Sequence, residues 1–428
     1  MNTSLNKGYD IVCLRCHSNV SDRGYTLRCE CGDALLRTVY HKRRLEPTRN
    51  SNIWKFDQWL PTNGKLTTSG RSITYKSVGL SKELGLKELY ISFNGYWPEM
   101  NAHLETCSFK ELESPPTVQR ALENGISALV ISSVGNTARA FAHTVTTSRA
   151  SINLIVVGLE SSSDKLWLPE KPSENVKLIY LKAGNDYFDA IALGERLSKV
   201  DELRPEGGVR NVARRDGMGT VILEAALTIG RTPQYYFQAI GSGAGGIAAW
   251  EASLRLQDTG QFLKAGLPQL HLSQNLPFVP MYNAWKARRR FIVPSIDMPN
   301  AKENITEIHA DVLSNRNPAY SMIGGVYDAL QDTSGEMYAV TNDEVIAAAS
   351  LFENLEGIDI VPAAAVATAS LLQAVEHQKI GASEIVLLNI TGGGEKRLLE
   401  DRQHHTIEPK LIVDNPRVPL EEILKAIT

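Results

Sequence analysis

The sequence predicts an α/β protein built on parallel sheets. Short apolar runs at residues 127–132, 235–240 and 384–390 have the length and composition of strands buried on both faces. Each run ends in small or glycine residues where a helix is expected to follow. Strands and helices alternate over residues 127–216, and again on a larger scale over 217–428. Ligands of such sheets bind at the carboxyl ends of the strands, so the three turns predict one binding site.

Composition places the chain among ordinary globular proteins. Its 428 residues are 43% hydrophobic and 22% charged, enough for two or three domains with buried cores. The net charge of −3 gives no overall attraction to nucleic acid or anionic membranes. No apolar stretch approaches the roughly 18 residues of a transmembrane helix. Residues 1–8 lack a signal-peptide core and the five cysteines are an odd number, so we expect a cytoplasmic protein.

The chain divides into four expected segments. Residues 1–45 form a zinc-ribbon-like segment, 46–126 begin a larger domain, 127–216 form a small α/β domain, and 217–428 complete the larger domain. Within the first part of the larger domain, Ser114 followed by two prolines predicts the start of a helix that ends near Gly125.

Four of the five cysteines lie near the amino terminus and form two close pairs. They are Cys13, Cys16, Cys29 and Cys31. Paired cysteines on tight turns supply the tetrahedral thiolates of a structural zinc site. The second pair is one residue shorter than usual, so His17 is an alternative ligand. A ribbon with reduced cysteines and no metal is the other interpretation.

Two turns carry polar residues suited to pyridoxal phosphate (PLP). Lys110, in Thr106-Cys-Ser-Phe-Lys110, is a candidate for the lysine that holds the cofactor and moves protons. Asn136, in Ser133-Val-Gly-Asn-Thr137, can hydrogen-bond the 3′-oxygen of the cofactor ring. The helix that follows offers free N–H groups to a substrate carboxylate. The alternatives are a solvated lysine and an ordinary helix cap.

A glycine-rich turn follows the strand at 235–240 and has the spacing G-x-G-x-x-G. Its expected phosphate-binding residues are Gly241, Ser242, Gly243, Ala244 and Gly245. A dinucleotide fold would place an acidic residue at the end of the next strand, but that strand ends Leu272-Ser273-Gln274. A phosphate cradle of backbone N–H groups therefore fits better than a nicotinamide-dependent dehydrogenase, and a turn packed on the sheet is the non-functional alternative.

Thr391 follows the strand at 384–390 and precedes three glycines. Its hydroxyl can hydrogen-bond the pyridine nitrogen of PLP. A neutral partner leaves this nitrogen largely unprotonated, which favours β-elimination over transamination.

In their order along the chain, these motifs resemble the threonine synthase family of fold type II PLP-dependent enzymes. The resemblance spans the cysteine ribbon to the Thr391 turn. It implies a tryptophan synthase β-like fold, with two three-layer α/β/α domains and a small amino-terminal cysteine ribbon. It also implies that Lys110 carries PLP, that Asn136 binds the ring 3′-oxygen, that Gly241–Gly245 bind the phosphate, and that Thr391 binds the ring nitrogen.

The chain departs from that family at three turns. One is the phosphate turn Gly241-Ser-Gly-Ala-Gly-Gly246, which is richer in glycine than the family's usual G-N-A-G-N. The family typically reads S-F-K-D-R-G around the lysine and T-G-H-G at the last turn, whereas this chain reads Ser108-Phe-Lys-Glu-Leu-Glu113 and Thr391-Gly-Gly-Gly394. These variants look like a branch on the coenzyme M pathway that joins O-phospho-L-serine and sulfite into L-cysteate and phosphate. Threonine synthesis from O-phosphohomoserine is the alternative. The departures after Lys110 and at Gly393 are expected to border the substrate, with Gly393 leaving open space.

We expect small-molecule substrates, a homo-oligomer, and no nucleic-acid or membrane partner. Arg214 and Arg215 are candidates for holding an anionic substrate group, whereas the basic residues at 286–290 have the pattern of a solvated face. A zinc-ribbon nucleic-acid module fused to an inert α/β domain is disfavoured, because residues 13–31 contain three arginines and no aromatic run to stack bases.

Overall fold

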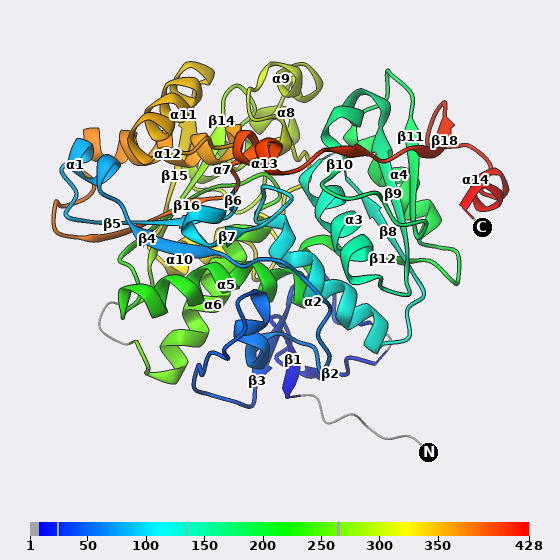
Figure 1. The fold of residues 1–428 in the computed structure, drawn as a ribbon, viewed down its shortest axis with the longest axis horizontal. Helices are drawn as coiled ribbons and strands as arrows, with labels where there is room; N and C mark the ends of the chain where they lie inside the picture. The colour runs from blue at the N-terminus through cyan, green and yellow to red at the C-terminus, as the bar shows by residue number, and fades with distance from the viewer. Residues whose placement is uncertain (1–7, 24, 134, 263–265, 428) are drawn as a thin grey trace.

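The computed structural model describes residues 8–23, 25–133, 135–262 and 266–427 (Figure 1). Residues 1–7, where we expected no signal peptide, lie outside the described residues, as does Val134 of the predicted turn Ser133–Thr137. In the part that is described, no helix is long and apolar enough to cross a membrane.

The larger of the two main sheets has six strands in the order β15-β14-β13-β16-β5-β4, and only β4 runs antiparallel to its neighbour. The strands are β4 (Ile73–Lys76), β5 (Glu88–Phe93), β13 (Tyr235–Ala239), β14 (Gln269–Asn275), β15 (Glu336–Val340) and β16 (Ile385–Ile390). Successive side chains point to opposite faces of a strand, so Tyr236 packs with helices α5 and α6, and Phe237 packs with α12. Both faces are therefore covered, as an apolar parallel sheet requires.

The smaller main sheet has five parallel strands in the order β12-β8-β9-β11-β18. The strands are β8 (Ala128–Ser132), β9 (Asn153–Leu159), β11 (Val176–Leu181), β12 (Arg204–Pro205) and β18 (Pro409–Val413). Helix α3 (Asn136–Ser148) covers one face, and α4 (Tyr187–Leu197) and α14 (Leu420–Ile427) cover the other. The prediction of two three-layer α/β/α units is confirmed.

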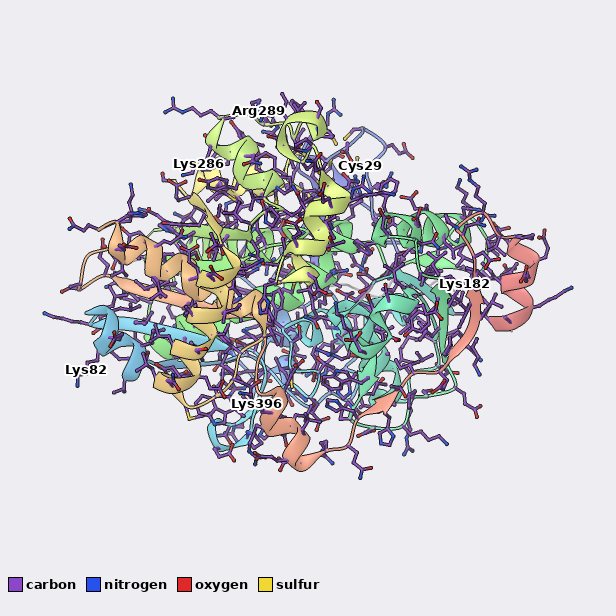
Figure 2. All side chains as sticks on the ribbon, turned by 90° about the horizontal axis from the view of Figure 1, so that it is seen from above. Cys29, Lys82, Lys182, Lys286, Arg289 and Lys396 are labelled. Carbon is purple, nitrogen blue, oxygen red and sulfur yellow. The ribbon has the colours of Figure 1, made fainter. Side chains whose placement is uncertain are left out.

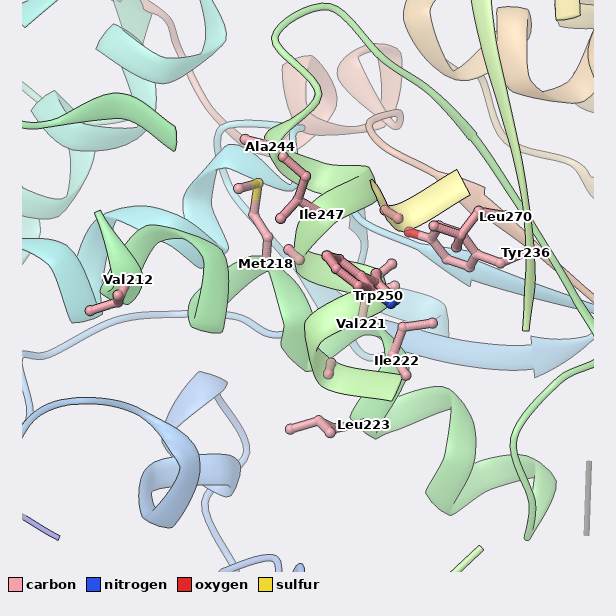
Figure 3. Packing of buried hydrophobic residues seen from close by; sticks show 14 of the residues in the cluster. Val212, Met218, Val221, Ile222, Leu223, Tyr236, Ala244, Ile247, Trp250 and Leu270 are labelled. Atoms are coloured by element: carbon pink, nitrogen blue, oxygen red, sulfur yellow. The ribbon is translucent and has the colours of Figure 1, made fainter. Parts of the chain in front are cut away.

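The other helices lie around the larger sheet (Figure 1), and one of them, α2, also packs Val118 and Ala121 into the core of the smaller unit. They are α1 (Gly79–Leu84), α2 (Lys110–Glu123), α5 (Val212–Ile229), α6 (Ala244–Thr259), α7 (Pro280–Lys286), α8 (Pro294–Asp297), α9 (Ala301–Glu307), α10 (Val326–Asp332), α11 (Asn342–Glu356), α12 (Pro362–Glu376) and α13 (Glu395–Asp401). Figure 3 shows Met218 and Val221 of α5 packed near Ile247 and Trp250 of α6. Helix α5 is buried on nearly all sides, so it has no single apolar face, and its buried charged residues Arg214, Arg215 and Asp216 are held in ion pairs.

Short elements complete the chain. They are the 3-10 helices η1 (Ile53–Trp59), η2 (Pro98–Met100), η3 (Glu160–Lys165), η4 (Gly208–Arg210) and η5 (Asp311–Leu313), and the two-residue strands β6 (Tyr96–Trp97), β7 (Ala102–His103), β10 (Trp167–Leu168) and β17 (His405–Thr406). Strand β10 pairs with β17, so the chain after α13 crosses from the larger unit to the smaller one.

The amino-terminal ribbon is a three-stranded antiparallel sheet. Its strands are β1 (Tyr9–Cys13), β2 (Asn19–Val20) and β3 (Leu36–Tyr40). It docks on α2 and α5 through buried polar contacts: Tyr40 donates to Asp216 of α5 (2.6 Å), and Asp22 pairs with Arg120 of α2. The ribbon is therefore joined to the helices that carry the site described below.

The start of helix α2 differs from the prediction. The helix begins at Lys110, one turn before Ser114, and Phe109 is its N-cap. The N–H of Lys110 donates to the Ser108 hydroxyl (3.3 Å), and the N–H of Glu111 donates to the Ser108 carbonyl (3.0 Å). Ser114 lies inside the helix and donates to the carbonyl of Ala140 (3.1 Å). The predicted end near Gly125 is confirmed.

The carboxyl terminus also differs from the prediction. Strand β18 pairs with β11 of the smaller sheet, although we placed all of residues 217–428 in the larger domain. Its Val413 and the following Ile423 of α14 are buried in the core of the smaller unit, which gives the physical reason for this placement. The other domain limits stay predictions.

Candidate active site

All eight predicted cofactor residues lie around one cavity, to which turns from both main sheets contribute. They are Lys110, Asn136, Gly241, Ser242, Gly243, Ala244, Gly245 and Thr391. The turns follow strands β8, β13 and β16 at their carboxyl ends, where the sequence pattern placed a binding site. The roles of the individual residues stay predictions.

Lys110 is the first residue of α2, and its side chain is 18% exposed. Its Nζ lies 4.7 Å from the ring centre of Phe109 and 4.0 Å from Sδ of Met218. Burial lowers the pKa of Lys110; the Glu113 carboxylate opposes this shift, and the charge of Arg214 adds to it. The amine is therefore closer to the neutral form that a nucleophile or base requires.

The amide of Asn136 is oriented by Arg139, one turn further along α3. Arg139 Nη2 donates to Oδ1 of Asn136 (2.9 Å), so the amide NH₂ group is left to donate elsewhere. Arg139 is itself held over the ring of Trp167 at 4.1 Å and meets Glu395 of α13 at 3.5 Å. This orientation fits an amide that donates to the 3′-oxygen of PLP.

The glycine turn after β13 forms a cradle at the amino terminus of α6. Gly243 has φ +86°, and a Cβ there would lie 2.3 Å from Cγ2 of Val326, so a larger residue does not fit. Among the described residues that line the cavity, only Lys110 and Arg214 are charged. A phosphate at this turn would therefore be held by backbone N–H groups and the helix dipole, which is an arrangement suited to PLP.

Thr391 joins the third turn to the lysine loop. Its carbonyl accepts a hydrogen bond from the N–H of Phe109 (2.9 Å), and Ser108 forms an isolated bridge with Gly392. The threonine and the lysine therefore sit on two segments that are fixed to each other. Thr391 lines the cavity and is 5% exposed, which suits a hydroxyl partner for the ring nitrogen.

The expectation that Gly393 leaves open space beside the substrate is wrong. A Cβ at Gly393 would lie 2.4 Å from the carbonyl oxygen of Asp359 and 3.1 Å from the ring of Phe93. Gly393 is also not among the described residues that line the cavity. The glycine here permits close approach of two backbones and does not enlarge the substrate site.

The two arginines predicted to hold an anion differ in position. Arg215 is 1% exposed and pairs with Glu251 (2.8 Å), away from the cavity. Arg214 lines the cavity, but it already pairs with Glu113 and Glu206, each at 2.8 Å. The charge of Arg214 is thus compensated, and it is a weaker anion site than the sequence suggested.

Other predicted features lie on the surface or serve the fold. Lys286 and Arg289 lie at the periphery (Figure 2) and pair with Glu336 (2.9 Å) and Asp297, so the solvated-face interpretation fits. Glu356, whose role the sequence left open, accepts hydrogen bonds from Ser77, Leu80 and Tyr75 and so anchors the start of α1.

Several cavity residues were not singled out from the sequence, and one of them, Gln238, lies within the predicted strand at 235–240. The cavity is lined by Tyr187 of α4, Gln238 of β13 and Asn315. Glu206 forms an ion pair with Arg214. No spacing rule connects these positions in the sequence, because the fold brings them together from both sheets and from the loop after η5.

The four amino-terminal cysteines form one cluster. All their Sγ atoms lie within 4.8 Å of one another, with Cys13 and Cys31 at 3.4 Å and Cys16 and Cys29 at 3.7 Å. Four thiolates bound to one zinc at about 2.3 Å would stand about 3.8 Å apart, so the arrangement fits a structural zinc ion. His17 is not part of the cluster.

Cys13→Ser is expected to lower stability more than turnover. Cys13 is fully buried in β1, and loss of one zinc ligand should destabilise the fold by about 2 kcal/mol or more, seen as a lower Tm in thermal unfolding. Metal analysis should find at most one zinc per wild-type chain and less in the variant. Loss of turnover in a well-folded Cys13→Ser protein would contradict a purely structural role.

The fold and cavity described above define a class of cofactor enzyme. The model of the family described as "Pyridoxal-phosphate dependent enzyme" matches residues 70–392, a range that includes Lys110, Asn136, Gly241–Gly245 and Thr391. The chain therefore belongs to the PLP-dependent enzyme family: it is an enzyme, and PLP is its cofactor.

Curated relatives match nearly the whole chain. A cysteate synthase of Methanocella paludicola is 56% identical over 420 residues, covering 98% of this chain and 97% of the relative. A cysteate synthase of Methanosarcina acetivorans is 54% identical over 413 residues, covering 96% and 98%.

Solved structures share the fold at low sequence identity. Maize serine racemase has a TM-score of 0.55 at 14% identity, covering 77% of this chain and 91% of its own. A pyridoxal 5′-phosphate-dependent aspartate racemase has a TM-score of 0.56 at 15% identity, covering 76% and 90%. These likenesses support the predicted fold type II architecture.

Proposed function

We propose that this enzyme makes L-cysteate and phosphate from O-phospho-L-serine and sulfite. The observation that carries the proposal is the 56% identity, over 98% of the chain, with a cysteate synthase. The cavity supports the same reaction class, because a lysine, an amide, a phosphate cradle and a neutral hydroxyl surround one space. A cytoplasmic location and a homo-oligomer remain part of the proposal.

Lys110 moves the proton in the proposed reaction. When bound, PLP withdraws electrons from the α-carbon of the amino acid, which makes the α-proton acidic. Lys110 Nζ, whose pKa is lowered by burial, removes this proton and later returns it to the same carbon. Between these steps the bond from the β-carbon to the phosphate oxygen breaks and a carbon–sulfur bond to sulfite forms. No oxidant is needed, and sulfite is nucleophilic without activation by a base.

The two anionic substrates must be bound mainly by neutral hydrogen-bond donors, because Arg214 is already paired with two carboxylates. Ser133 and Asn315 line the cavity and supply a hydroxyl and an amide group for this purpose. The free N–H groups at the start of α3 are suited to the substrate carboxylate.

Parallel assays of two substrate pairs test this function. We expect sulfite-dependent phosphate release from O-phospho-L-serine, with L-cysteate identified by mass spectrometry. A reaction without sulfite is the control. Threonine formation from O-phosphohomoserine, without sulfite-dependent phosphate release, would overturn the cysteate assignment in favour of threonine synthase activity.

A further inference from the structure

Glu113 is a fully buried carboxylate beside the candidate catalytic lysine. Its Oε2 lies 3.6 Å from Nζ of Lys110 and 2.8 Å from Nε of Arg214. These are ion-pair contacts, because Oε2 has no well-aligned hydrogen bond to any residue that the structure describes. The other oxygen accepts from the hydroxyl of Thr137 (3.3 Å). One carboxylate oxygen is therefore shared between two cations.

Arg214 is fixed beside Glu113 as its ion-pair partner. Its Nη1 donates to Glu206 (2.8 Å), and its Nη2 donates to Thr137 (3.2 Å). If the guanidinium moved away, the buried carboxylates of Glu113 and Glu206 would both lose an ion-pair partner. Removing one partner of such a buried ion pair is strongly destabilising, so the arrangement holds Arg214 in place. Arg214 is therefore the ion-pair partner of Glu113, and Glu113 is the ion-pair partner of Lys110.

The charges that surround Lys110 come from three elements. Glu113 lies on α2, Arg214 on α5, and Glu206 follows β12. Tyr187 of α4 also lines the cavity; burial raises the pKa of its hydroxyl, so it stays neutral at ordinary pH. Among these groups, only Glu113 lies within ion-pair distance of Nζ.

The position of Glu113 separates this chain from the family pattern that its motifs resemble. In S-F-K-D-R-G the third residue after the lysine is glycine, which has no side chain to contact the amine. Here that residue carries a carboxylate, one turn along α2 from Lys110. The contact is thus a property of this chain and not of the general motif.

We propose that Glu113 is a positioning residue that holds the amino group of Lys110 whenever the lysine is not bound to the cofactor. The inference rests on the proposed function, in which Lys110 takes up a proton as the substrate C–H bond breaks. Glu113 stabilises the resulting ammonium ion, and Arg214 holds the Glu113 carboxylate in place. The proton remains on Nζ until it returns to the α-carbon, so no further acid or base is consumed.

The test measures the pKa of Lys110 in protein freed of PLP. The pH dependence of labelling by acetic anhydride, read on the Lys110 peptide by mass spectrometry, gives this pKa without substrate or cofactor. A nearby carboxylate favours the charged form of an amine, so Glu113→Gln should lower the pKa, with about a tenfold or greater loss of proton affinity. Glu113→Asp keeps the charge but moves it away from Nζ, so a smaller fall is expected.

Glu111→Gln is the matched control. Glu111 lies on the same helix and is 1% exposed, but it contacts Ser69 (2.9 Å) and the N–H of Thr106 (2.7 Å) and not Lys110. We expect the Lys110 pKa to be unchanged in this variant. If Glu113→Gln does not fold, Glu113→Asp carries the test.

An unchanged Lys110 pKa in the folded Glu113 variants, or an equal fall in Glu111→Gln, overturns the proposal. The titration uses neither amino acid nor sulfite, so its outcome is separate from the substrate assays. Failure of cysteate formation would leave a measured Lys110–Glu113 coupling intact, and the reverse also holds.

Discussion

Lys110→Ala is expected to reduce turnover by about 10³-fold or more, the largest effect of any substitution in this chain. Lys110 is the lysine that lines the cavity in the part of the chain described, and its Nζ is held by Phe109, Met218 and Glu113. Alanine removes both the covalent attachment point for PLP and the base that moves the α-proton. Steady-state kinetics on the reconstituted variant measures the loss.

Covalent trapping identifies the lysine directly. Borohydride reduction of the wild-type enzyme, followed by peptide mapping, should place the PLP label on the peptide that contains Lys110. Lys82→Ala is a suitable control, since Lys82 projects from the surface of α1 (Figure 2) and is not among the cavity residues. A label on another lysine, or full activity in a folded Lys110→Ala protein, would refute the assignment.

Most of the cofactor cavity could be predicted because its residues sit on turns that local sequence patterns define. A buried strand followed by glycine places the turn at the carboxyl end of a sheet, whatever the rest of the fold does. For this reason Asn136, Gly243 and Thr391 were all found, although they come from two different sheets.

The residues that tune the cavity could not be found in this way. Arg139 contacts Asn136 from one turn further along its helix. Glu206, which pairs with Arg214, follows a two-residue strand with no motif. Such contacts depend on how separate elements pack, which no short spacing encodes. Gly393 illustrates a different error. The sequence suggested that this glycine shapes the substrate site, but it is required because the backbone carbonyl of Asp359 leaves no room for a Cβ.

Boundary errors have similar causes. Ser114 is a good helix cap by composition, yet the helix starts earlier, at Lys110, where Ser108 accepts a hydrogen bond from the first N–H. Strand β18 was assigned by its position in the sequence, although its pairing with β11 is decided by the open edge of the smaller sheet. A local hydrogen bond accompanies the actual start of α2, and pairing with a distant strand decides the placement of β18.

Thr391→Asp is expected to change the type of reaction as well as its rate. A carboxylate beside the pyridine nitrogen favours the protonated form of that nitrogen, because a nearby negative charge stabilises a positive one. Protonation makes the ring a stronger electron sink, so transamination should compete with β-replacement. We expect cysteate formation to fall by about tenfold or more, with pyridoxamine phosphate accumulating during turnover, detected by chromatography of the released cofactor.

Thr391→Ser is the matched variant, because it keeps the hydroxyl and removes only a methyl group. The backbone of residue 391 is tied to Phe109 by a hydrogen bond of 2.9 Å, so neither substitution should move the turn relative to Lys110. Serine should therefore keep the wild-type product ratio, and aspartate alone should alter it. Equal product ratios and equal cofactor absorbance in wild type, Thr391→Ser and Thr391→Asp would mean that residue 391 does not contact the ring nitrogen, and another partner for that atom would have to be sought among the cavity residues.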